Sequence, residues 1–237
     1  MRVESILSLM QIDIFSDPVC PWCFIGKRRL ERFLADHPIP DLAIRWRVFQ
    51  LNPGMPDEGM DRDEYMATKF GDPEAAQEIY ARVREAGEAE GIDFNFDAIG
   101  RTPSTVDAHR LINMAPTPEM QDEVVENLFR AYFLEGADIG DRETLVEIGA
   151  VSGLDPDSVR ETYDSGDGFD VVENEMSLAS SVGIQGVPCF IIDGKYAVVG
   201  AQEPDAFVQV FERIAEMETT ANDTDADLAN ADPKDRD

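Results

Sequence analysis

Two cysteines, Cys20 and Cys23, form the chemically most informative pair in the chain, with Pro21 and Trp22 between them. A thiol pair at this spacing suits a disulfide that opens and closes during a reaction, and the apolar, strand-like run at 12–15 just before it favours redox chemistry. A helix that begins at Cys20 would direct free N–H groups and the positive end of its dipole at that thiol, which stabilises a thiolate. We therefore predict Cys20 as the nucleophile and Cys23 as the thiol that resolves the mixed disulfide.

Metal binding is the main chemical alternative for such a pair. A zinc site needs about four ligands, commonly arranged as two pairs. The chain offers only Cys189, His37 and His109 as further soft ligands, at no matching spacing. We predict no metal and no bound organic cofactor. A pair of inert, buried thiols is the remaining alternative, and the position at a helix start argues against it.

The segments around the cysteines predict a strand, a helix and a second strand. Residues 20–36 carry an apolar stripe at helical spacing, and residues 42–49 alternate as a strand with one apolar face. Two strands joined by a helix over so short a stretch are expected to pair in parallel through a right-handed crossover.

Helical patterns then dominate the middle of the chain, and no strand-like segment is expected to interrupt them. Strand signals return at 189–199, where Asp193-Gly194 predicts a tight hairpin turn before a last helix. From about residue 218 the chain is rich in Asp, Asn, Ala and Thr without periodicity, which predicts a disordered acidic tail. We expect an α/β fold of residues 10–56 and 184–217, an all-helical insertion at 57–183, and the tail at 218–237.

Composition limits the range of functions. The chain has 49 acidic and 20 basic residues, a net charge of −29, and such a surface repels nucleic acid and anionic lipid. Acidic excess with scarce lysine also suggests a salt-rich habitat. No apolar run approaches the roughly 18 residues of a membrane span, and the N-terminal residues lack the apolar region of a secretory signal. Three cysteines are too few for a secreted disulfide framework, so we expect a cytoplasmic protein, either a monomer or a homodimer.

A second motif, Gly186-Val187-Pro188, stands immediately before the predicted hairpin. Together with the Cys-X-X-Cys helix and the order of elements, it resembles the thioredoxin fold, and the helical insertion resembles DsbA-type oxidoreductases. Residues 16–27 and 186–202 resemble the FrnE-like branch of that family. The resemblance implies that Pro188 is cis beside the cysteine pair and that Val187 offers backbone hydrogen bonds to an extended substrate. It also implies that Pro21 and Trp22 tune the redox-active disulfide.

The resemblance implies a thiol–disulfide oxidoreductase acting on protein or small-molecule thiols and disulfides, with glutathione as a candidate co-substrate. Glutathione-dependent isomerases of the 2-hydroxychromene-2-carboxylate type and kappa-class transferases are related, but they carry Ser at the position of Cys20. A redox-linked chaperone is a third alternative. Cys189 is either a small core thiol or a third redox participant. His109 lies in a segment that resembles the junction between insertion and active site, where a structural histidine is expected.

Overall fold

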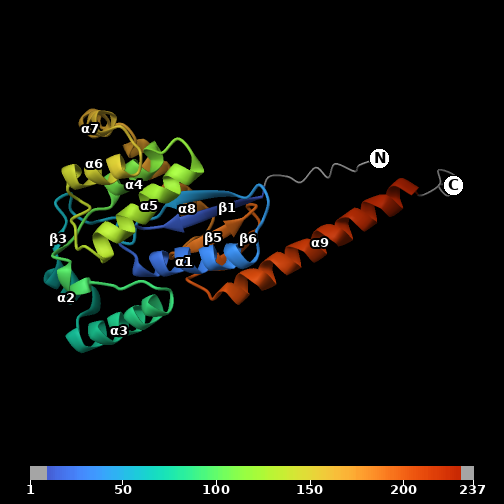
Figure 1. Cartoon of the computed structure of the whole chain (residues 1–237), viewed down its shortest axis with the longest axis horizontal. Coiled ribbons are helices and arrows are strands. Elements are labelled where there is room, and N and C mark those ends of the chain that lie inside the picture. The colour runs from blue at the N-terminus through green and yellow to red at the C-terminus, as the bar shows by residue number, and fades with distance from the viewer. Residues whose placement is uncertain (1–9, 231–237) are drawn as a thin grey trace.

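A computed structural model describes residues 10–230 and shows a four-stranded mixed sheet at the centre of the molecule (Figure 1). The strands, in the spatial order β2-β1-β5-β6, are β1 (Gln11–Ser16), β2 (Ala43–Val48), β5 (Cys189–Ile192) and β6 (Tyr196–Val199). β1 pairs in parallel with β2, as predicted, and antiparallel with β5. The β5–β6 pair is the antiparallel hairpin that turns at Asp193 and Gly194.

The two faces of the sheet are covered by different helices. α1 (Pro21–Asp36) and the first turns of α9 (Pro204–Asn230) share one face, where Phe190 of β5 meets Phe207 with ring centroids 5.1 Å apart. α8 (Phe169–Ser181) contributes to the other face, where Ala179 packs with Phe15 and Cys189. Neighbouring residues of β5 therefore face opposite layers, as expected for the two-residue period of a strand.

The chain between β2 and β5 is mostly helical. Figure 1 shows two groups, with α2 and α3 on one side of the molecule and α4 to α7 on the other. Asp72, Thr117, Asp141 and Asp155 cap helices α3, α5, α6 and α7, because each side chain accepts a hydrogen bond from a first-turn N–H. The elements are α2 (Arg62–Phe70), α3 (Pro73–Ala89), the short 3-10 helix η1 (Phe96–Ala98), α4 (Val106–Met114), α5 (Pro118–Phe133), α6 (Arg142–Val151) and α7 (Pro156–Ser165).

An aromatic cluster joins α1 to the inserted helices. The ring of Phe24 stacks on Phe129 at a centroid distance of 5.0 Å and meets the edge of Phe94 at 6.1 Å. These rings belong to one continuous core that also contains Ile12 and Ile14 of β1. The sheet and the insertion are thus packed together, and the division at residues 57 and 183 stays a prediction.

The structure differs from the expected elements at two places. β3 (Met60–Asp61) and β4 (Arg101–Thr102) form a two-stranded antiparallel ladder inside the block expected to be all-helical. The sequence does not predict them, because strands of two residues leave no periodic pattern. α9 continues to Asn230, where a disordered tail was expected from residue 218. No Gly or Pro interrupts residues 218–230, so a helix already nucleated at Pro204 can propagate through them. The last part of the expected tail, 231–237, lies outside the described residues.

None of the helices within residues 10–230 combines the length and apolar character needed to cross a membrane.

Candidate functional site

The two cysteines lie at the start of α1, as the sequence predicts. Cys20 is the N-cap residue with an extended backbone, and Pro21 occupies the first turn. The Cys20 N–H donates to the Asp17 carbonyl at 2.9 Å, and the Cys23 N–H donates to the Cys20 carbonyl at 3.0 Å. Both cysteines are free thiols and both are buried, with 4% of Cys20 and 1% of Cys23 exposed. The helix start therefore places the positive end of its dipole beside both sulfurs.

The loop before β5 lies against Cys20. Its Val187–Pro188 peptide bond is cis, the isomer that the resemblance implies. The Cys20 Sγ lies 3.7 Å from the Val187 carbonyl oxygen, to which its thiol donates. Gly26 permits this approach, because a Cβ there would lie 2.8 Å from Pro188 Cγ and 3.2 Å from Phe190 Cζ. The fold thus brings Cys20 into contact with a loop 167 residues away in sequence.

Cys23 is held as a thiol. Burial raises its pKa well above the ordinary value, and the neighbouring Cys20 thiol raises it further. The Ser16 hydroxyl and the Asp17 backbone N–H oppose this rise in the pKa of Cys23 without cancelling it. Cys23 therefore has to lose a proton at the moment it attacks a disulfide, because the thiolate is the nucleophilic form.

A buried carboxyl and a buried imidazole lie close to the cysteines, and sequence reasoning did not identify this pair. Asp17 is 0% exposed, and its carboxylate accepts hydrogen bonds from the Leu51 N–H at 2.7 Å and the Val19 N–H at 3.4 Å. Burial raises the pKa of Asp17 to about 6 despite these bonds. The Ser-Asp-Pro sequence is typical of a turn, so it carries no signal that this aspartate turns inward.

The imidazole belongs to His109 on α4. Its Nε2 lies 3.0 Å from the Phe49 carbonyl oxygen, so Nε2 carries a proton and donates it. The same atom lies 3.9 Å from Asp17 Oδ1. Burial lowers the pKa of His109 to about 4, so at neutral pH the ring is uncharged and the two side chains form no ion pair. His109 therefore connects the inserted helices to the loop that follows β2.

The cations of α1 are engaged with the surrounding elements. Lys27 is buried and lies 3.0 Å from Asp122 of α5, and Arg29 lies 2.9 Å from Glu90 next to α3. Arg28 pairs with Glu126 of α5. These ion pairs hold α1 against the inserted helices and compensate the charges of its cations.

Two further predicted site residues, Trp22 and Cys189, lie on different faces of the sheet. Trp22, between the two cysteines, is half-buried and packs against the main core. Cys189 is 3% exposed and packs on the α8 face of the sheet, whereas Cys20 and Cys23 belong to the core on the α1 face. Burial raises the pKa of Cys189. Within residues 10–230, no three His, Cys, Asp or Glu side chains converge in a way that could hold a metal ion.

A dithiol at the start of the helix after β1, facing a cis-proline loop at β5, is the arrangement of a thioredoxin-fold protein. Residues 11–212 match the family described as DSBA-like thioredoxin domain, and the chain belongs to this family.

Known proteins are similar to this chain over most of its length. The chain is 28% identical over 199 residues to the uncharacterized protein YwbO of Bacillus subtilis, covering 84% of this chain and 94% of that protein. A probable DsbA oxidoreductase from Streptomyces coelicolor is similar in structure, with a TM-score of 0.78, 31% identity, and coverage of 86% of this chain and 89% of that chain. The cytosolic disulfide reductase DsbM from Pseudomonas aeruginosa, solved with GSH, has a TM-score of 0.61 and 18% identity over 86% of this chain and 99% of that chain, which shows a shared fold.

Proposed function

We propose that the protein is a thiol–disulfide oxidoreductase that acts through Cys20 and Cys23. The observation that carries this proposal is the position of Cys20. Its sulfur lies at a helix start, 3.7 Å from the Val187 carbonyl and beside the cis Val187–Pro188 bond. Membership of the DsbA-like family supports the same chemistry. Pro188 and the backbone of Val187 would then line the site where an extended substrate reaches the thiols.

The proposed reaction proceeds in two exchange steps. The Cys20 thiolate attacks one sulfur of a substrate disulfide, which forms a mixed disulfide and releases the other substrate sulfur as a thiolate that takes up a proton. Cys23 then loses its proton and attacks the Cys20 sulfur, which forms the Cys20–Cys23 disulfide and releases the second substrate thiolate. The protein loses two electrons and the substrate disulfide gains two. In reverse, the same steps oxidise two substrate thiols.

We propose that the protein acts in the cytoplasm on protein or small-molecule thiols and disulfides. Glutathione is a candidate co-substrate, and the proposed reaction uses no bound organic cofactor. The low number of cysteines supports a reducing compartment. The similarity in fold to DsbM, a cytosolic disulfide reductase solved with GSH, supports the same setting. The FrnE-like branch rests on the motifs around Cys20 and Pro188 alone.

Replacing each cysteine in turn tests the mechanism. Cys20→Ser should abolish the reduction of insulin disulfides and the rescue of scrambled ribonuclease, because it removes the nucleophile. Cys23→Ser should instead accumulate a mixed disulfide with the substrate, visible as a mass adduct on Cys20, because resolution is lost. Full activity of Cys20→Ser would rule the mechanism out. Tight glutathione binding together with transferase or isomerase turnover would then favour the related glutathione-using enzymes. Retention of unfolded clients by the double variant would favour a chaperone.

A further inference from the structure

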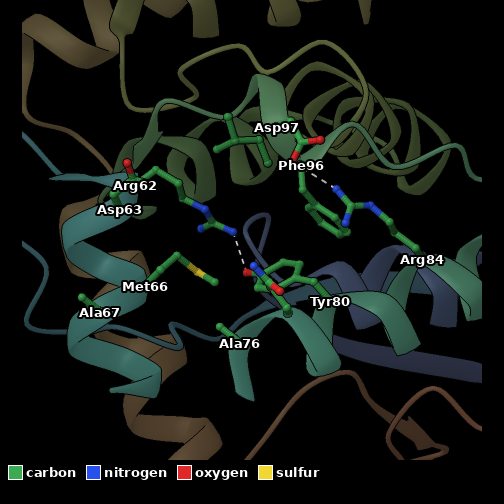
Figure 2. A pocket seen from close by; sticks show the side chains of 11 residues that line it. Arg62, Asp63, Met66, Ala67, Ala76, Tyr80, Arg84, Phe96 and Asp97 are labelled. Atoms are coloured by element: carbon green, nitrogen blue, oxygen red, sulfur yellow. Dashed lines mark hydrogen bonds and ion pairs between the residues drawn. The ribbon is translucent and has the colours of Figure 1, made fainter. Parts of the chain in front are cut away.

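A cavity of about 600 Å³ lies between α2, α3 and η1 (Figure 2). Its walls include the Tyr80 ring, the Phe96 ring at 4.6 Å and nearly perpendicular to it, and the Met66 side chain. Figure 2 shows Arg62 extending from α2 across the cavity toward Tyr80. The volume and the mixture of apolar walls with a few polar groups are typical of small-molecule sites.

The guanidinium of Arg62 has no acidic partner at ion-pair distance within the described part of the chain. It donates to the Thr102 hydroxyl at 2.9 Å and to the Tyr80 hydroxyl at 2.5 Å, both neutral acceptors. A guanidinium has five N–H donors, so donors remain for a further acceptor. Arg84, the other arginine of the cavity, lies 3.2 Å from Asp97, which compensates its charge. Asp63, the second acidic lining residue, is exposed.

A series of aromatic contacts connects the cavity wall to the helix that carries the dithiol. Phe24, the residue after Cys23, meets Phe94 at 6.1 Å, and Phe94 stacks on Phe96 of the cavity wall at 4.8 Å. Burial raises the pKa of the Tyr80 phenol, and Arg62 lowers it. Phe94 and Phe96 belong to the same hydrophobic core as Cys20 and Cys23, so the cavity wall and the dithiol are parts of one packed unit.

We propose that this cavity binds a small thiol or disulfide that carries one carboxylate on an apolar body. The proposal rests on the proposed oxidoreductase function and names its substrate class. The carboxylate would accept hydrogen bonds from the free donors of Arg62, in the charge-assisted geometry that guanidinium groups favour. The apolar body would lie against Tyr80 and Phe96. A single negative charge matches a single uncompensated guanidinium, whereas the net charge of −29 repels polyanions.

The test uses an unreactive probe, N-acetyl-S-benzylcysteine, and its uncharged methyl ester, titrated into the wild-type protein by calorimetry. Because the thioether cannot exchange, binding is measured independently of redox activity. We expect the acid to bind at least about tenfold more tightly than the ester, the size of a lost charge-assisted hydrogen bond. Arg62→Gln should remove that preference. Arg82→Gln is the matched control, because Arg82 is an exposed arginine of the neighbouring helix α3 that does not line the cavity.

Equal binding of acid and ester to the wild-type protein would overturn the proposal, as would an acid preference that survives in Arg62→Gln. Thermal melts check that Arg62→Gln folds, and Arg62→Lys, which keeps the charge, should retain part of the preference. If both variants fail to fold, the acid-to-ester ratio in the wild-type protein still decides. Failure of the oxidoreductase function would appear separately, as full insulin reduction by Cys20→Ser, and would leave the binding result intact.

Discussion

At the scale of single residues, burial shifts the pKa values of Asp17 and His109 in opposite directions. The pKa of Asp17 rises from 3.8 to about 6, so the folded protein holds a proton that the unfolded chain has lost over that interval. Stability therefore falls as pH rises through this window. The pKa of His109 falls from 6.5 to about 4, so the unfolded chain holds the extra proton and stability rises with pH. The two contributions nearly cancel.

Asp17→Asn should expose this cancellation. With the carboxyl gone, the contribution of His109 is no longer offset. The unfolding free energy of the variant, relative to wild type, should increase by about 3 kcal/mol as pH rises from about 4 to about 7, following the shift of roughly two pKa units. Urea unfolding of both proteins at several pH values measures the difference. Both proteins share all other carboxyl groups, so the titration of those groups cancels in the difference between the two unfolding free energies.

Asp93→Asn provides the control for this pH series, because Asp93 is exposed. Its difference from wild type should stay flat with pH. A flat difference for Asp17→Asn as well would show that the Asp17 carboxyl is not buried as described.

Cys189 differs from the other two cysteines in the layer it occupies. Because it faces Phe15 and Ala179 on the α8 side, we expect Cys189→Ser to keep at least about half of the exchange activity, the change being one of core packing alone. After mild oxidation of the wild-type protein, peptide mass spectrometry should find only the Cys20–Cys23 linkage. Any disulfide within one molecule that includes Cys189 would assign it a redox role.

At the scale of elements, α1 is held against three neighbours. Gly26 meets the Pro188 ring, Lys27 meets α5, and Arg29 meets the residue that follows α3. The buried Lys27 is paired with Asp122 and lies 3.4 Å from Glu126, so its charge is compensated. These contacts determine where Cys20 sits relative to the cis-proline loop.

Gly26→Ala tests whether the close contact between α1 and the cis-proline loop positions Cys20. Alanine favours a helix over glycine by about 1 kcal/mol, but its Cβ would lie 2.8 Å from Pro188 Cγ, and a proline ring cannot rotate away. The loop should shift, and the insulin-reduction rate should fall roughly ten- to hundredfold, as expected when reacting groups are misplaced by about 1 Å. Gly54→Ala is the control, because nothing lies within 4 Å of a Cβ there. Unchanged activity of Gly26→Ala would mean that the contact does not position Cys20.

The elements that the sequence predicts are those with a local signal. The Cys20 helix, the hairpin at Asp193-Gly194 and the capped helices each follow from spacing or from a turn residue. The two-residue strands β3 and β4 have no such signal, since each is defined only by its partner. For the same reason the motifs predicted Cys20 and Pro188, whereas Asp17 and Arg62 depend on which distant residues the fold packs around them.

At the scale of the whole molecule, the charge is strongly unbalanced. The chain has 49 acidic and 20 basic residues, and many of the cations are already used in ion pairs such as Arg28–Glu126 and Arg47–Glu175. Acidic residues therefore far outnumber the cations that could pair with them. Their mutual repulsion destabilises the compact state more than the unfolded chain, in which the charges lie further apart.

Salt should therefore stabilise the protein. Raising KCl from about 0.01 M to about 1 M shortens the Debye length from about 30 Å to about 3 Å, which screens repulsion across the whole surface. The loss from screened surface ion pairs is smaller, because each contributes only about 0–1 kcal/mol. We expect the midpoint of urea unfolding to rise with KCl. K₂SO₄ at equal ionic strength separates the causes: screening alone makes the two salts coincide, whereas exclusion of sulfate from the surface gives the larger rise in sulfate. A midpoint that stays level or falls with KCl would show that the acidic surface is not under repulsive stress, and would count against adaptation to a salt-rich habitat.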